Sequence, residues 1–139
     1  MTGSSLLIAL AALLIASPPP APPDVGPRIA AARAAAQGLQ GPLDGSWLLR
    51  DAAGRPLYRF EIVDPAGGRG PLTGAWRDAR DAGAGFIATM RRGGQSLQLE
   101  FSSGGEAATR LRLIERSPGV WTGQMMENGA RRSVVLRRN

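Results

Sequence analysis

Apolar and polar residues alternate along most of the chain from residue 45 onward. Within residues 96–102, for example, Leu97, Leu99 and Phe101 alternate with Gln98 and Glu100. Alternation with a period of two is typical of a β-strand that has one buried face and one solvated face. The pattern returns roughly every dozen residues and predicts eight short strands, at residues 46–51, 57–64, 72–78, 86–91, 96–102, 109–115, 120–126 and 132–138.

Turn signals separate these predicted strands and keep most of the connections short. Gly93-Gly94 and Asn128-Gly129 are two-residue hairpin signals, and Pro118-Gly119 marks another turn. Short connections favour an up-and-down order of antiparallel strands. Eight strands with one apolar face can close into a small barrel, which removes exposed edges. The sequence therefore predicts an all-β fold, a single antiparallel eight-stranded meander that closes into a barrel, with a β-sandwich as the alternative.

The inward-facing positions follow from the same alternation. In the strand at residues 86–91, we expect Phe86, Ala88 and Met90 to point inward. The barrel interior is then lined by large side chains, which are the candidate ligand-binding residues: Trp47, Tyr58, Phe60, Trp76, Met90 and Trp121.

The N-terminus contains an apolar run of 11 residues, at residues 6–16. A membrane-spanning helix needs about 20 such residues, whereas the apolar core of a signal peptide has about 7–15. We therefore expect residues 1–21 to be a signal peptide, which places the protein in the periplasm or outside the cell. The alternative is an uncleaved segment that anchors the protein in the membrane through residues 6–16.

Residues 22–42 are expected to link this segment to the β domain at residues 43–139. The linker begins Pro-rich and stiff, and residues 28–37 are Ala-rich and predict a short helix that stops at Gly38. The apolar face of this helix is thin. It can lie against the β domain, fray in solvent, or plug one end of the barrel.

Composition excludes several kinds of chemistry. The chain has no cysteine and no histidine, which removes disulfides, thiol nucleophiles, Cys or His zinc sites and imidazole acid–base catalysis. The acidic residues are expected mostly in turns or on outward positions, and no pair is placed for glycosidase chemistry. No phosphate-binding loop or nucleophile motif is present. We expect neither enzymatic activity nor a cofactor.

The charge of the chain indicates what its surface can attract. All 17 basic residues are arginine, against 11 acidic residues, and the net charge is +6. Such a balance favours attraction to anionic surfaces. It can also reflect codon bias and an ordinary solvated face. A specific nucleic-acid site would need exposed aromatic side chains, and here these point inward. The arginines expected to alternate outward on the strands are Arg50, Arg59, Arg77, Arg91, Arg110, Arg112, Arg132 and Arg137.

One short motif occurs twice, as P-L-x-G-x-W at residues 42–47 and again at residues 71–76. Glycine allows close backbone approach in a strand, and the tryptophan two residues later lies on the same face and can fill the space. On these residues the chain resembles the avidin and lipocalin barrels, in which G-x-W opens the first strand of an eight-stranded meander. Residues 72–76 and 121–124 are also similar to avidin strand motifs.

The resemblance implies a barrel but argues against biotin as a ligand. Where biotin-binding avidins have an asparagine two residues after the first tryptophan, this chain has Leu49. Where they have a serine contact two residues after the aromatic of the third strand, it has Asp78. We therefore expect an exported, non-catalytic binding or interaction module of unknown ligand. The alternatives are a carrier of a small apolar ligand in the interior and a periplasmic protease-inhibitor-like barrel whose extended arm is the Pro-rich segment.

Overall fold

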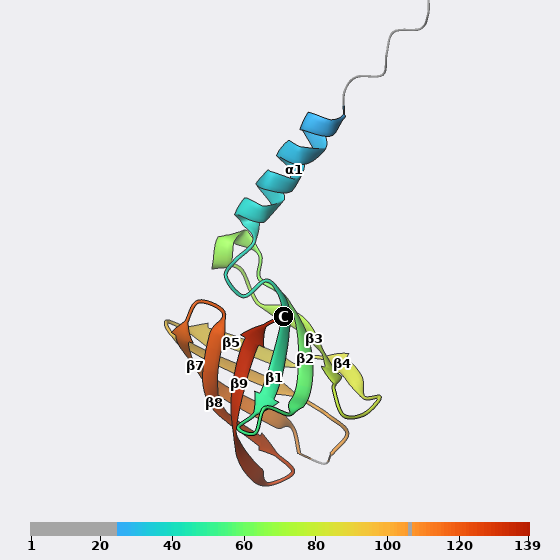
Figure 1. The fold of residues 1–139 in the computed structure, drawn as a ribbon, viewed down its shortest axis with the longest axis vertical. Helices are drawn as coiled ribbons and strands as arrows, with labels where there is room; N and C mark the ends of the chain where they lie inside the picture. The colour runs from blue at the N-terminus through green and yellow to red at the C-terminus, as the bar shows by residue number, and fades with distance from the viewer. Residues whose placement is uncertain (1–24, 106) are drawn as a thin grey trace, which may run out of the picture.

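The computed structural model describes residues 25–105 and 107–139. It contains one α-helix, α1 (Gly26–Leu39), one 3-10 turn, η1 (Ala66–Gly68), and one antiparallel sheet that curls into a half-barrel (Figure 1). The mostly β architecture predicted from the alternation is thereby confirmed. The strands are β1 (Gly45–Asp51), β2 (Pro56–Val63), β3 (Thr73–Asp78), β4 (Ala84–Phe86), β5 (Thr89–Gly93), β6 (Ser96–Phe101), β7 (Thr109–Ser117), β8 (Val120–Glu127) and β9 (Ala130–Arg138).

Strands that follow one another along the chain are mostly neighbours in the sheet. The order is β4-β3-β2-β1-β9-β8-β7-β6-β5, so the first long strand lies beside the last one. The pairing of β1 with β9 joins Trp47 to Arg138 and Asp51 to Val134. This single non-local pairing places two hairpin meanders, β1–β4 and β5–β9, side by side in one sheet.

The strand predicted at residues 86–91 is two strands in the structure. Residues 84–86 pair with β3, residues 89–93 pair with β6, and the chain kinks between them. The amide of Ile87 still donates to Gly74 O at 2.9 Å, whereas the amide of Ala88 donates to Glu100 O at 2.9 Å. Because the backbone changes partner here, the inward–outward alternation is interrupted.

This kink overturns the predicted orientation of two side chains. Phe86 is 87% exposed, and Ala88 is also exposed, although both were expected to point inward. Ile87 packs against the core in their place, and Met90 is partly buried there as predicted. A strict period of two fails because the residues on either side of the kink belong to different strand pairs.

The other predicted strands are confirmed to within a few residues at each end. Asn128 and Gly129 have φ of 49° and 77°, the two positive values that a tight two-residue hairpin of this kind requires. The strand predicted to end at residue 115 continues to Ser117 through a register shift between Glu115 and Ser117. The strand predicted to begin at residue 132 begins two residues earlier, at Ala130.

The core fills the concave side of the sheet with aliphatic and aromatic side chains. The glycine of the second P-L-x-G-x-W motif does not make room for its own tryptophan. A Cβ on Gly74 would lie 2.7 Å from Glu61 O, whereas the Trp76 ring packs on Gly85, its partner across the β3–β4 pair. The buried apolar residues of this core are Leu43, Trp47, Leu49, Leu57, Tyr58, Phe60, Ile62, Trp76, Leu97, Leu99, Phe101, Leu111, Leu113, Trp121, Met125, Val134 and Leu136.

Helix α1 confirms the helix predicted at residues 28–37 and extends it at both ends. The predicted end at residue 37, with Gly38 as the stop, is two residues early, because the helix includes Gly38 and Leu39. The helix projects away from the sheet (Figure 1), and its described side chains are exposed, so it does not plug an end of the curled sheet. Among the described residues, no helix combines the length and apolar character needed to cross a membrane. The signal peptide expected at residues 1–21 lies outside the described residues.

A buried ion pair fastens the segment that enters β1. Asp64 is fully buried and accepts hydrogen bonds from the Arg92 guanidinium and from the amide of Leu43, the latter at 3.0 Å. Burial alone would raise the pKa of Asp64, but the hydrogen bonds from Arg92 and Leu43 hold it below its ordinary value. The amide of Gly41 donates to Asp64 O at 2.7 Å. These hydrogen bonds therefore hold residues 41–44 against the end of β2.

Candidate functional site

The six residues predicted to line the interior all lie on the concave side of the sheet. Five of them are at most 6% exposed, and Met90 packs against them at the edge of the core. Phe101 lies among three of them, with ring-centroid distances of 4.9 Å to Tyr58, 5.6 Å to Phe60 and 5.3 Å to Trp76. These side chains fill the space between one another in the manner of a packed core.

One end of the core is covered around Trp47. The indole Nε1 donates to Leu43 O at 2.8 Å, and the Arg138 guanidinium lies 4.6 Å from the ring centroid. Arg138 also donates to Asp44 O and Pro42 O, both at 2.5 Å. A cleft of about 420 Å³ opens beside this cover and is lined in part by Trp47, Trp121 and Glu115.

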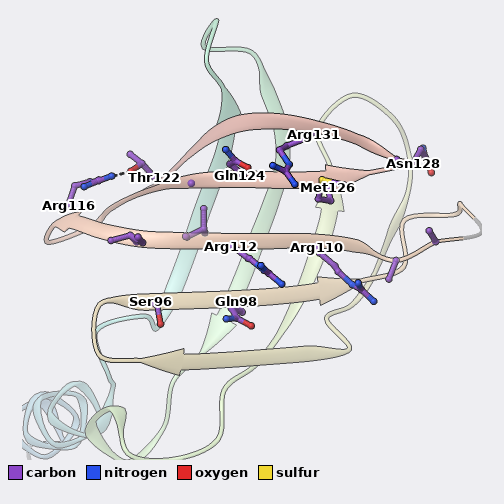
Figure 2. Close-up of a pocket in the computed structure, with 16 residues that line it drawn as sticks. Ser96, Gln98, Arg110, Arg112, Arg116, Thr122, Gln124, Met126, Asn128 and Arg131 are labelled. Carbon is purple, nitrogen blue, oxygen red and sulfur yellow. Dashed lines mark hydrogen bonds between the residues drawn. The ribbon is translucent and has the colours of Figure 1, made fainter.

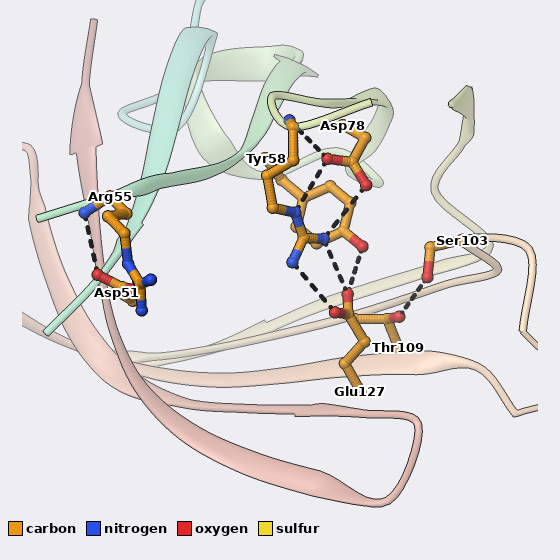
Figure 3. Close-up of polar contacts among 8 residues, drawn as sticks. Asp51, Arg55, Tyr58, Asp78, Ser103, Thr109 and Glu127 are labelled. Carbon is orange, nitrogen blue, oxygen red and sulfur yellow. Dashed lines mark hydrogen bonds and ion pairs between the residues drawn. The ribbon is translucent and has the colours of Figure 1, made fainter. Parts of the chain in front are cut away.

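The opposite end of the core carries a polar network (Figure 3). The buried Tyr58 hydroxyl donates to Glu127, and Arg80 bridges Glu127 at 3.2 Å and Asp78 at 3.1 Å. The Arg80 guanidinium also lies over the Tyr58 ring, 4.8 Å from its centroid. Burial raises the pKa of Tyr58, and the Glu127 carboxylate adds to the effect. Burial would raise the pKa of Glu127 as well, but the hydrogen bonds from Arg80 and Tyr58 lower it overall.

The convex side of β6–β9 carries a groove of about 880 Å³ (Figure 2). Four arginines line it, and we call this feature the arginine groove: Arg110, Arg112, Arg116 and Arg131. Arg110 and Arg112 are two residues apart on β7, and alternation therefore turns both outward. Neutral polar side chains, including Gln98, Gln124 and Thr122, lie between them.

The charges of the arginine groove are only partly compensated. Arg110 Nε lies 3.2 Å from the Glu100 carboxylate, and Arg116 Nε donates to Thr122 Oγ1 at 2.8 Å. Within the part of the chain that the structure describes, Arg112 and Arg131 form no ion pair and no side-chain hydrogen bond. Unpaired guanidiniums with several free donors each are suited to bind carboxylate, sulfate or phosphate groups.

The outward arginines were predicted correctly with one exception. Arg132 is half-buried and shares the inward side of β9 with Val134 and Leu136. The neighbouring Arg131 takes the outward position and lines the groove. The alternation itself contained this signal, because Val134 and Leu136 were expected inward and have the same parity as Arg132. Arg50, Arg59, Arg77, Arg91, Arg110, Arg112 and Arg137 are exposed, as expected.

Two arginine-groove residues, Arg116 and Arg131, were not among the arginines singled out from the sequence. Both lie just beyond predicted strand ends, at residues 115 and 132, in strand extensions that the hairpin turns stabilise. Continuing the alternation from Arg110 and Arg112 by four residues would have found Arg116. No sequence signal showed that Arg131 is two strands away from Arg112, because that proximity depends on the pairing register.

Two of the carboxylates are buried and make structural hydrogen bonds. Asp51 lies at a turn, as expected, whereas Asp64 at the end of β2 is fully buried and so departs from the expected turn or outward position. Asp51 accepts hydrogen bonds from the amides of Ala53 and Arg55, each at 2.9 Å, within its own turn. The described residues contain no group of three or more acidic side chains that could hold a metal ion.

Comparison with known proteins adds no relative to this picture. The chain matches no protein-family model, and neither the curated proteins nor the solved structures contain a match to it.

Proposed function

We propose that this chain is an exported, non-catalytic binding module that holds an anionic ligand in the arginine groove. The observation that carries the proposal is the groove itself, a hollow of about 880 Å³ with four arginines along its walls. The net charge of +6 supports the same sign of ligand at longer range. The groove lies on central strands of the sheet, so its side chains stand on a rigid base.

A closed barrel of the avidin and lipocalin type is part of this proposal. Residues 84–93 bond to β3 with their first half and to β6 with their second half. The strands at the two ends of the sheet order, β4 and β5, are therefore consecutive in the chain, which supports closure of the sheet into a barrel. The meander and the Gly45-Ser46-Trp47 opening of β1 support the family resemblance. Export rests on the apolar segment at residues 6–16, with retention as a membrane anchor as the alternative.

The first prediction concerns the charges of the groove. Replacing Arg112 and Arg131 together by Gln should weaken binding of a heparin oligosaccharide about tenfold at low salt, since two uncompensated guanidiniums are lost. The matched control replaces Arg59 and Arg77 by Gln. Both residues are exposed and are paired with each other on β2 and β3. In the sheet order, β1 separates these two strands from β6–β9, which carry the groove. Isothermal titration calorimetry measures both double variants.

The control should change the heparin affinity by less than about twofold, because screening limits the reach of surface charges to roughly 10 Å at 0.1 M salt. An equal loss in both double variants would mean that heparin responds to overall charge and not to the groove. Affinity that does not fall as salt is raised would also contradict the proposal.

A second candidate function uses the cleft beside Trp47 and Trp121. Its volume of about 420 Å³ is within the range of small-ligand pockets, and two of the predicted interior residues line it. A small apolar ligand bound there should quench tryptophan fluorescence in a saturable way. Titration with a medium-chain fatty acid tests this carrier function, and a linear, non-saturating response would remove it.

The protease-inhibitor-like alternative rests on the Pro-rich arm within residues 22–42. It predicts that the chain slows a co-secreted protease and that removing residues 22–39 abolishes the effect. An inhibition assay with the two forms tests it, and equal inhibition by both would exclude a role for the arm.

A further inference from the structure

Five outward side chains form one row that crosses the sheet at right angles to the strands. The register pairs Arg91 with Gln98, Gln98 with Arg112, Arg112 with Gln124, and Gln124 with Ser133. All five residues are exposed. Because directly paired residues of an antiparallel sheet project from the same face, these side chains stand side by side on the convex surface. We call them the transverse row.

The transverse row alternates charged and neutral groups at a regular interval. Neighbouring strands lie about 4.8 Å apart, so the backbones of the two arginines are separated by roughly 10 Å, with an amide between them. A second amide and a hydroxyl continue the row beyond Arg112. Neither Arg91 nor Arg112 has an ion pair within the described residues. Cationic side chains and neutral hydrogen-bonding side chains therefore alternate along the row.

Within the described residues, the adjacent rows lack the alternation of unpaired arginines with neutral amides, although one of them ends at the unpaired Arg131. On one side, Glu100 pairs with Arg110 across β6 and β7 and compensates its charge. On the other side, the corresponding β7 position is Ile114, which is 49% exposed. The apolar side chain and the compensated pair therefore flank the transverse row and mark its width.

Several polymer classes fit the row poorly. No aromatic side chain lines the arginine groove, so the bases of a single-stranded nucleic acid would find no stacking surface. Strands β6, β7 and β8 are each paired on both sides, so a peptide cannot add to them as a further strand. A partner that spans the row from Arg91 to Ser133 therefore lies across the strands and is recognised through side chains.

We propose that the transverse row binds an acidic polysaccharide that carries a carboxylate on every second sugar. A hexose unit extends such a chain by about one strand spacing, so successive carboxylates would meet Arg91 and Arg112. The hydroxyls of the intervening neutral sugars would bond to Gln98 and Gln124, whose amides both donate and accept. Guanidinium groups bind carboxylates through two parallel hydrogen bonds, which fixes the register of the chain. This inference rests on the proposed function of the arginine groove.

The test compares two oligosaccharides with the same number of sugars in the full-length protein. Hyaluronan oligosaccharides carry a carboxylate on every second sugar, and polygalacturonate oligosaccharides carry one on every sugar. We expect hyaluronan to bind several-fold more tightly by calorimetry at equal salt, although it has half the charge. Tighter binding of polygalacturonate would overturn the match between ligand and row.

Variants of the amides separate this inference from simple charge attraction. Replacing Gln98 and Gln124 by Leu should weaken hyaluronan binding about tenfold and change the binding of inorganic polyphosphate, an anion without sugar hydroxyls, by less than about twofold. The matched control replaces Gln40 and Gln95 by Leu, because both residues are exposed and lie outside the row. Urea unfolding of each variant checks that the fold is retained, and Gln98→Asn with Gln124→Asn serves if the leucine variant does not fold.

The outcomes of these experiments distinguish the proposed anion-binding function from the polysaccharide inference. If heparin binding depends on Arg112 and Arg131 but the amide variants leave hyaluronan binding unchanged, the groove binds anions and the polysaccharide inference is wrong. If neither heparin nor hyaluronan binding depends on those arginines, the proposed function is wrong as well.

Discussion

At Gly123, the backbone of β8 lies close against the backbone of β7. A Cβ at this position would lie 1.9 Å from Arg112 O and 2.9 Å from the Leu113 Cα. These are backbone atoms of the neighbouring strand, so no side-chain rotation can relieve the overlap. The residue opposite is Leu113 in the core, and Arg112 beside it is in the arginine groove. The glycine thus sets how closely the two groove-bearing strands approach.

A methyl group at Gly123 should therefore be costly. We predict that Gly123→Ala lowers the free energy of unfolding by about 3 kcal/mol, because the two strands must separate locally. The matched control is Gly93→Ala on β5, where the nearest atom would be Ser96 Oγ at an ordinary 3.4 Å. It should change stability by less than about 1 kcal/mol. Urea unfolding measures both, and similar stability of the two variants would contradict this account.

At the scale of elements, the segment of residues 41–44 joins the helix to the sheet through specific contacts. Leu43 is buried, and its amide donates to Asp64. The Asp64 amide in turn donates to Asp44 Oδ1 at 3.0 Å, and Arg138 from β9 bonds to the carbonyls of Pro42 and Asp44. By contrast, the described side chains of α1 make no buried contact with the sheet. The folded unit therefore begins after the helix.

Truncation should reveal this boundary. Removing residues 1–39 should change the free energy of unfolding by less than about 1 kcal/mol, because the removed helix is exposed. Removing residues 1–44 should cost on the order of 3 kcal/mol or more, since Leu43 leaves the core and Asp64 loses a partner. Thermal unfolding followed by circular dichroism compares the two forms. A large loss on removing residues 1–39 would show that α1 contributes to the domain.

The Asp64–Arg92 pair gives a second prediction at this scale. Asp64→Asn should lower the free energy of unfolding by about 3 kcal/mol, because it leaves a partly buried guanidinium without its counter-charge. The control is Glu100→Gln, which breaks the exposed pair with Arg110 and should cost less than about 1 kcal/mol. Urea unfolding at neutral pH checks both, and equal costs would argue against a structural role for the buried pair.

The sequence predicted most strands of this fold but not how they are arranged across the sheet. Alternation locates buried positions such as Leu97, Leu99 and Phe101 because side-chain direction is a local property of a strand. The kink between Phe86 and Thr89 is not local, since it arises where the backbone changes from one partner strand to another. For the same reason, the outward arginines could be predicted while the alignment of Gln98, Arg112 and Gln124 could not. Register requires knowledge of both strands.

At the scale of the whole molecule, carboxylates at both ends of the core have lowered pKa values. Burial favours the neutral acid at Asp64, Asp78 and Glu127, but the hydrogen bonds from Arg92, Arg80 and other donors outweigh it. A carboxylate whose pKa is lower when folded stabilises the fold above its unfolded pKa, near pH 4. That stability is lost as the pH falls through the folded value.

We therefore predict that stability is nearly constant from about pH 5 to pH 8 and falls steadily below about pH 4. Urea unfolding at a series of pH values measures this dependence. In Glu127→Gln the decline below pH 4 should be shallower, because one of the linked carboxylates no longer titrates. Stability that increases on acidification would show that these ion pairs do not favour the folded state.

The pairing of β1 with β9 also has a consequence for the time at which the chain folds. Trp47 and Arg138 are neighbours in the sheet although most of the domain separates them along the chain. Closing so large a loop is slow, and its entropic cost is met only when the last strand is present. A chain still emerging from the ribosome can form hairpins but not the complete sheet. The sheet should therefore remain incomplete until β9 has been synthesised, and an incompletely folded polypeptide can still be threaded through a narrow channel.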